Sequence, residues 1–182
     1  MELRLAHPNE VDDIMTIIEE ARAFLKASGS DQWQGKYPAA SDIIDDILQG
    51  QAWVGLIDDE IVAYAAVIVG QDPAYENITD GKWKHANHQY TVFHRVAVSK
   101  KASGQKVGQT FIQGLIEGHK GPDFRCDTHP KNLIMQHILE KLGYEYCGKV
   151  MFEGERLAYQ KIKSKSETAD YQEIDEGLRY DL

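Results

Sequence analysis

The sequence predicts an α/β (α+β) domain built on a single mixed, mostly antiparallel sheet flanked by helices. The chain has 182 residues, 42% of them hydrophobic, which suffices for one core and is too short for two comfortable domains. Strand-like and helix-like segments follow one another in the order β-α-α-β-β-β-α-β-α-β-β. Because this order mixes hairpins with two strand–helix units, the sheet needs both parallel and antiparallel neighbours.

The N-terminal part predicts one strand and two amphipathic helices. Residues 3–5 alternate apolar and polar side chains, as a half-buried strand does. Asn9 is the expected N-cap of a first helix, whose apolar residues recur at helical spacing until the chain reaches Gly29. Ser41 is the expected N-cap of a second helix, and Gly50 closes it.

The rest of the chain predicts two hairpins with two strand–helix units between them. The expected strands are rich in β-branched and aromatic residues and span residues 52–57, 61–69, 90–98, 124–129, 144–152 and 156–162. The expected helices span residues 104–118 and 130–142. A long polar connection covers residues 71–88. We expect residues 1–162 to form the domain and residues 163–182 to form an acidic C-terminal tail.

Composition excludes several functional classes. A net charge of −9 argues against general binding of nucleic acid, which needs clustered basic residues. No apolar stretch approaches the roughly 20 residues that span a bilayer, and no secretory leader is present, so we expect a cytoplasmic protein without a membrane partner. Cys126 and Cys147 each fall in a strand pattern, which favours buried free thiols over a disulfide or a metal site.

One strand–loop–helix junction is a candidate anion site. Residues 96–109, Val-Ala-Val-Ser-Lys-Lys-Ala-Ser-Gly-Gln-Lys-Val-Gly-Gln, pass from a buried strand through a glycine-bearing loop into a helix. A helix N-terminus presents unpaired N–H groups, and glycine lets a phosphate approach the backbone. The spacing matches neither G-x-x-x-x-G-K-[ST] of a P-loop nor G-x-G-x-x-G of a Rossmann dinucleotide site.

A second segment follows the next expected strand, beginning at Asn132 and ending in Glu-Lys-Leu-Gly-Tyr at residues 140–144. In its place after that junction and a strand, it resembles the second CoA-binding segment of the GNAT superfamily of acetyl-CoA-dependent N-acetyltransferases. The resemblance covers residues 2–162 in element order and is specific in sequence mainly over residues 96–148. It implies a GNAT-like acyl-CoA N-acyltransferase fold and direct transfer of acetyl from the cosubstrate acetyl-CoA to a primary amine of a small molecule or peptide, without a metal.

The resemblance also assigns the cosubstrate contacts. The strand backbone is expected to pair with the pantetheine arm where the strand diverges from its neighbour, and the loop N–H groups are expected to hold the pyrophosphate. Asn132 is expected to hydrogen-bond the pantetheine arm. The residues assigned in this way are Val96, Ala97, Val98, Ser103, Gly104, Gln105, Lys106, Val107, Gly108, Gln109 and Asn132.

Three positions depart from the family pattern. The family loop is usually written [QR]-x-x-G-x-[GA], and here Ser103 replaces the basic or amide residue and Lys106 replaces the first glycine. Many relatives use a tyrosine as the proton donor seven residues after the helix-starting asparagine, where this chain has Leu139. Tyr144 is not its positional equivalent and is interpreted as a core residue. A non-catalytic CoA- or acyl-CoA-binding sensor or regulatory protein is therefore a second hypothesis.

Direct transfer also needs a base for the attacking amine. His94 lies two residues before Val96 and is expected on the same face of the strand, and histidine titrates near neutral pH. Its alternative role is that of a hydrogen-bonded structural histidine. Asp127 and His129, at the end of the next strand, form a second candidate pair, with orientation of a neighbour or loop as the alternative role of Asp127.

The loop of residues 31–38 joins the two early helices, which border the acceptor site in the superfamily. Trp33 and Tyr37 in this loop are candidate substrate-binding residues, and the alternative for Trp33 is packing of the loop on the core. A homodimer formed through the terminal hairpin, residues 144–162, is a further hypothesis.

Overall fold

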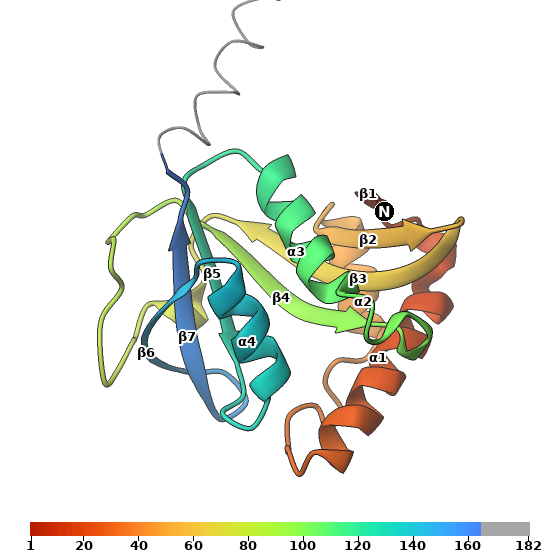
Figure 1. Cartoon of the computed structure of the whole chain (residues 1–182), viewed down its shortest axis with the longest axis horizontal. Coiled ribbons are helices and arrows are strands. Elements are labelled where there is room, and N and C mark those ends of the chain that lie inside the picture. The colour runs from red at the N-terminus through yellow and green to blue at the C-terminus, as the bar shows by residue number, and fades with distance from the viewer. Residues whose placement is uncertain (165–182) are drawn as a thin grey trace, which may run out of the picture.

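The chain folds around one seven-stranded sheet with the strand order β1-β2-β3-β4-β5-β7-β6 (Figure 1). The structure is a computed structural model that describes residues 1–164. The strands are β1 (Glu2–Leu5), β2 (Ala52–Ile57), β3 (Glu60–Val69), β4 (Thr91–Val98), β5 (Asp123–Thr128), β6 (Glu145–Met151) and β7 (Glu155–Ile162). Only β4 and β5 pair in parallel within this sheet. The expected mixed, mostly antiparallel sheet is confirmed.

Helices cover both faces of the sheet (Figure 1). They are α1 (Val11–Ala27), α2 (Ala40–Leu48), α3 (Val107–Gly118) and α4 (Leu133–Lys141). Ala63 and Ala65 of β3 pack with Phe111 of α3 on one face, whereas Tyr64 packs with Ile18 of α1 on the other. This division follows from the alternation of side chains along a strand. A third apolar cluster lies beneath the connection between β3 and β4.

The two expected N-caps are wrong, although the helices they were assigned to are present. Asn9 lies inside a short 3₁₀ turn, Pro8–Glu10, that precedes α1. Ser41 lies inside α2, where the carboxylate of Asp42 instead accepts a hydrogen bond from the Ala39 N–H at 2.6 Å. An acidic side chain three positions into the helix satisfies the free N–H there, so a hydroxyl is not needed.

The parallel pair β4–β5 opens into a V. Pairing joins Thr91–Phe93 of β4 to Phe124–Cys126 of β5, and beyond these residues the two strands diverge (Figure 1). The last part of β4 therefore presents backbone groups that β5 does not pair. This is the divergence expected at Val96 and Val98.

A β-bulge interrupts β4 at the point where it leaves β5. Arg95 and Val96 lie opposite the single residue Ala65 of β3, and Arg95 has a φ of 54°. The extra residue breaks the alternation of side chains. His94 therefore contacts Asp72, while Val96 packs in the cluster of α3, so the expectation that His94 and Val96 share a face is wrong.

The structure also bears on the expectations for the cysteines, for membrane-spanning helices, for metal-binding groups and for the tail. Cys126 and Cys147 are buried free thiols, as expected. Within residues 1–164, no helix has the length and apolar character to cross a membrane, and no group of three or more His, Cys, Asp or Glu side chains could hold a metal ion. Most of the expected acidic tail, residues 165–182, lies outside the described residues.

Candidate active site

His94 lies between two carboxylates at the start of the V between β4 and β5. Its Nε2 is 2.6 Å from Oδ2 of Asp72, and its Nδ1 is 3.8 Å from Oδ1 of Asp127. All three side chains are largely buried, with exposed fractions of 8%, 12% and 8%. The pairing with Asp72 fixes the ring and supports an Nε2–H tautomer, which leaves Nδ1 as the nitrogen with a free lone pair.

The carboxylate of Asp127 is itself held by two partners. Tyr75 donates its hydroxyl to Oδ1 at 2.7 Å, and the Arg156 Nε lies 4.0 Å from Oδ2. Burial, followed by the charge of Asp127, raises the pKa of Tyr75 well above its ordinary value, so its hydroxyl stays protonated. The charges in this group are therefore arranged as Asp72, His94, Asp127 and Arg156, with signs that alternate when His94 is protonated.

Burial acts to raise the pKa of Asp72, but the hydrogen bond and charge of His94 outweigh it and leave that pKa below its ordinary value. Asp72 also accepts the Ala74 N–H at 2.9 Å, in the short turn that opens the long connection between β3 and β4. Asp72 is therefore an anion at neutral pH and can stabilise a proton on His94.

Arg125 anchors the connection that carries Asp72 and Tyr75. Its guanidinium pairs with Asp123 at 3.1 Å and lies 4.4 Å and 3.7 Å from the ring centroids of Trp83 and Tyr90. It also donates to the backbone oxygen of His85 at 3.1 Å. A buried cation on β5 thus holds the loop over the sheet, and Asp72 reaches His94 from a fixed position.

Arg95, next to His94, belongs to a second polar group. Its guanidinium forms a two-pronged ion pair with Asp46 of α2, in which Nε is 2.9 Å from Oδ2, and it donates to the Tyr37 hydroxyl at 2.6 Å. Tyr64 donates to the same Asp46 carboxylate. Burial raises the pKa of Tyr37 to about 12 although Arg95 acts to lower it, so this tyrosine is neutral at physiological pH.

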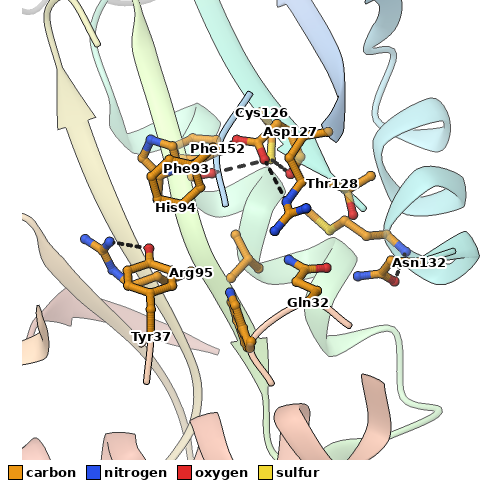
Figure 2. A pocket seen from close by; sticks show the side chains of 14 residues that line it. Gln32, Tyr37, Phe93, His94, Arg95, Cys126, Asp127, Thr128, Asn132 and Phe152 are labelled. Carbon is orange, nitrogen blue, oxygen red and sulfur yellow. Dashed lines mark hydrogen bonds and ion pairs between the residues drawn. The ribbon is translucent and has the colours of Figure 1, made fainter. Parts of the chain in front are cut away.

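Two adjoining cavities lie in and beside the V. The first, here called the catalytic cavity, has a volume of about 50 Å³ and is the pocket of Figure 2. The second, here called the cosubstrate groove, has a volume of about 230 Å³ and runs along the end of β4 between α1, α3 and α4. Gln32, Trp33, Val96, Asn132 and Met135 line both. A ligand in the groove can therefore present a reactive end to the catalytic cavity.

The structure divides the residues expected to hold the cosubstrate. Val96, Ala97, Val98, Ser103, Gly108 and Asn132 line the groove. Gly104, Gln105, Lys106, Val107 and Gln109 are not among its lining residues, and the Val107 side chain is buried in the core. Gly104, Gln105 and Lys106 form the turn before α3, and Val107 and Gln109 lie in the first turn of the helix. Asn132 caps α4 by accepting the Met135 N–H at 3.2 Å.

Lys106 shows what replaces the first glycine of the family loop. It precedes α3 in a left-handed conformation with a φ of 57°. This region is costly for side chains other than glycine, so lysine at this position strains the backbone of the turn before α3. A Cβ on Gly108 would meet Ile138 and Val98 at 3.4 Å.

The other candidate residues fall in three places. Asp127 and Tyr37 line the catalytic cavity, and Trp33 lines both cavities while being 7% exposed. His129 lines neither, because its Nε2 pairs with Asp31 at 2.8 Å on the loop before Trp33. Burial, and then the charge of Arg156, lowers the pKa of His129. The structure does not bring His129 to His94.

Leu139, at the position of the missing tyrosine, is fully buried in the core beneath α4. Tyr144 is buried in the same cluster, which agrees with its interpretation as a core residue. Neither residue lines the catalytic cavity or the groove.

Sequence reasoning missed Asp72, Tyr75, Phe152 and Arg156. The Phe152 ring lies 5.6 Å from the His94 ring and 5.5 Å from the Tyr37 ring, measured between centroids. Asp72 and Tyr75 come from the long polar connection, and Arg156 comes from β7, the strand that pairs with β5. Charged and aromatic residues within an unusually long connection were the available signal.

Comparisons with known proteins agree with this geometry. Residues 16–144 match the Acetyltransferase (GNAT) family. An acetyltransferase of the GNAT family from Streptococcus agalactiae has a solved structure that is 62% identical with a TM-score of 0.88, over 90% of this chain and 96% of that chain. A putative acetyltransferase from Staphylococcus aureus is 21% identical with a TM-score of 0.65, over 89% and 99% of the two chains, and shows the same fold.

A curated relative points to the same reaction class. The uncharacterized N-acetyltransferase YesJ of Bacillus subtilis is 26% identical over 145 residues, which is 76% of this chain and 78% of the relative. The family match spans more than half of the chain, and both the fold and the V between β4 and β5 accord with it. The chain is therefore a member of the GNAT acetyltransferase family and an acyltransferase.

Proposed function

We propose that this protein transfers the acetyl group of acetyl-CoA directly to a primary amine of a small molecule or peptide, with His94 as the general base. One observation carries the proposal. His94, oriented by Asp72 at 2.6 Å, lines a cavity that shares residues with the groove along the unpaired end of β4. This arrangement supports a base in the cavity beside a thioester held in the adjoining groove.

The groove suits an extended thioester. The end of β4 offers backbone groups that β5 does not pair, the α3 N-terminus follows the turn of residues 103–106, and Asn132 lies at the start of α4. Lys100 also lines the groove and supplies a cation for a phosphate-bearing ligand. When bound, acetyl-CoA supplies the activated acetyl group.

The residues of the catalytic cavity then have defined roles. His94 Nδ1 accepts a proton from the amine while Nε2–H donates to Asp72, and the charge of Asp72 stabilises the imidazolium. The amine nitrogen then attacks the carbonyl carbon and forms a tetrahedral intermediate, whose nitrogen loses its excess proton to water. Collapse of this intermediate breaks the carbon–sulfur bond, and the departing thiolate takes the proton from the imidazolium. The backbone at Val96, in the part of β4 that β5 does not pair, would stabilise charge on the carbonyl oxygen.

The experiment is calorimetric titration of the full chain with acetyl-CoA, followed by a thiol-release assay over a panel of primary amines. Micromolar binding with amine-dependent release of CoA thiol is expected. Binding without release for any amine would favour the sensor hypothesis, which the buried Leu139 at the usual tyrosine position supports. Failure to bind acetyl-CoA would overturn the proposal.

A further inference from the structure

Glu20 of α1 places a carboxylate in the wall of the cosubstrate groove. Of the described residues that line the groove, Glu20 and Lys100 are the two with charged side chains. A carboxylate repels an anionic ligand, so its charge does not explain its place in a groove that suits a phosphate-bearing cosubstrate. Its hydrogen bonds give a different reason for this position.

The Glu20 side chain joins α1 to the connection between β4 and α3. One carboxylate oxygen, Oε2, accepts the Lys100 N–H at 2.7 Å and the Ser99 hydroxyl at 3.1 Å. The connection lies beside α1, as Figure 1 shows, although Glu20 and Lys100 are 80 residues apart in the sequence. Two walls of the groove that come from distant parts of the chain are therefore tied together at this point.

The Lys100 N–H needs a partner because it opens the short 3₁₀ turn that follows β4. The first N–H groups of a helical turn have no partner within it. Ser99 accepts the Lys101 N–H at 3.3 Å, and Glu20 accepts that of Lys100. The Ser103 N–H then pairs with the Lys100 carbonyl at 3.2 Å. The place of Ser103 in the groove wall thus depends on a turn that Glu20 holds.

The end of the groove at this turn is the end that favours an anion. Gly108, in the first turn of α3, lines the groove together with Lys100 and Ser103. A helix N-terminus and an ammonium group both favour negative charge. Val96, earlier in the chain, lines both the groove and the catalytic cavity, where the proposed function places the thioester. The contact of Glu20 is therefore at the phosphate end.

We propose that Glu20 is a positioning residue for acetyl-CoA, which holds the connection between β4 and α3 against α1 so that Ser103 and the α3 N-terminus meet the diphosphate. The inference rests on the proposed function and adds a residue outside the segment 96–148, in which the sequence resemblance is specific. The role depends on the hydrogen-bonding oxygen of Glu20 and not on its charge. Glutamine offers such an oxygen at the same place, and alanine does not.

The test is calorimetric titration of acetyl-CoA into the native chain, Glu20→Ala and Glu20→Gln. Glu20→Ala is expected to weaken acetyl-CoA binding by about ten-fold, because part of the binding free energy must then order the connection. Glu20→Gln is expected to keep the dissociation constant within about three-fold of the native value. The control is Asp13→Ala, which removes an exposed carboxylate of α1 that lines neither the groove nor the catalytic cavity, and it is expected to leave the affinity unchanged.

A second ligand separates positioning of the phosphate end from general support of the fold. S-acetylpantetheine carries the thioester arm without the diphosphate and the nucleotide, and its affinity is expected to be the same in the native chain and in Glu20→Ala. The hydrogen bond to the Lys100 N–H is exposed, so water can replace the carboxylate there. The midpoint of denaturant unfolding is therefore expected to stay close to the native value in both Glu20 variants.

The outcomes separate the two proposals. If the native chain does not bind acetyl-CoA, the proposed function fails and this inference fails with it. If the native chain binds acetyl-CoA and Glu20→Ala binds it equally well, or Glu20→Gln is as weak as Glu20→Ala, the positioning role is wrong while the proposed function stands. Equal weakening of acetyl-CoA and S-acetylpantetheine binding in Glu20→Ala would likewise overturn the assignment of Glu20 to the phosphate end.

Discussion

His94 and Arg95 are neighbours in β4, yet their surroundings give them different capacities. Each of the three guanidinium nitrogens of Arg95 has a partner, because two of them pair with Asp46 and the third donates to Tyr37. His94 has one nitrogen on Asp72 and a second that faces Asp127 at 3.8 Å across the catalytic cavity. The paired guanidinium of Arg95 holds the bulge in place, and the His94 ring keeps one nitrogen available for proton transfer.

The bulge in β4 determines the positions of both side chains. The extra residue in β4 turns Arg95 toward α2 and leaves His94 facing the connection that carries Asp72. A regular strand would place the two side chains on opposite faces. Stability is therefore expected to depend on Arg95 and its partners, and turnover on His94 and its partners.

The largest effect is expected from Asp46→Ala. Removing this carboxylate leaves the Arg95 guanidinium, 11% exposed, without its main partner. A broken buried ion pair costs about 3–5 kcal/mol, which denaturant unfolding measures directly. The control is Asp45→Ala on the exposed side of α2, where the change is expected to stay within about 0.5 kcal/mol. Similar losses of unfolding free energy in Asp46→Ala and Asp45→Ala would contradict the structural role of the Arg95 group.

In contrast to Asp46→Ala, Asp72→Asn is expected to impair turnover more than it lowers the free energy of unfolding. Without the anion, a proton on His94 is less stabilised, so kcat falls by roughly 10- to 100-fold while acetyl-CoA affinity is unchanged. Steady-state thiol release measures kcat, and calorimetry measures the affinity. A drop in stability as large as that of Asp46→Ala, with kcat intact, would contradict the distinction between the two groups.

The same variant changes the acid dependence of stability. Burial opposes ionisation of Asp72, but His94 outweighs it and lowers the pKa of Asp72, so the unfolded chain binds more protons there than the folded one. The stability from this group is complete above about pH 4 and is lost as the pH falls below that value. Asp72→Asn is expected to flatten this part of the curve of unfolding free energy against pH.

Lys106→Gly is expected to give a smaller, favourable change. The residue occupies the left-handed region with a φ of 57°, which glycine adopts without strain. Relief of strain outweighs the added freedom of the unfolded chain, so the unfolding free energy rises by about 0.5–1 kcal/mol. The control is Lys101→Gly in the preceding 3₁₀ turn, where stability falls or does not change. A destabilised Lys106→Gly would show that the lysine side chain supports the turn.

The smallest effect is expected from Tyr37→Phe at alkaline pH. Burial raises the pKa of Tyr37 to about 12, so the folded protein keeps this proton when the unfolded chain, with a pKa of about 10, has lost it. The resulting stability is fully present below pH 10 and is lost as the pH rises toward 12. The variant is expected to lose stability less steeply across that window in denaturant titrations. If the unfolding free energies of the native protein and the variant fell in parallel with pH, the buried, protonated Tyr37 would be contradicted.

The fold could be predicted from sequence because its signals are local. Apolar spacing located all four long helices and the seven strands within a few residues, and the order of elements indicated a mixed sheet. The N-caps at Asn9 and Ser41 were wrong because acidic residues supply the capping there, and several residues at a helix start compete for that role.

The site could be predicted only in part. His94 and Asp127 lie together in the structure, but the face of His94 depends on the bulge at Arg95, and nothing in the local residue pattern marks an extra residue in β4. Asp72 reaches His94 from 22 residues away along a connection without regular periodicity. Long-range placement of this kind depends on tertiary contacts such as those of Arg125.

The most direct test of the account is the pH dependence of kcat/KM in the native protein and in His94→Gln, measured with a primary amine that supports thiol release by the native protein. At neutral pH the variant is expected to be about 100-fold slower or worse, with unchanged acetyl-CoA affinity, because no group removes the ammonium proton. The deficit is expected to shrink as the pH approaches about 10, where bulk solvent deprotonates the amine. The same substitution at exposed His137 is the control. A native rate for His94→Gln at neutral pH would contradict the assignment of His94 as the base.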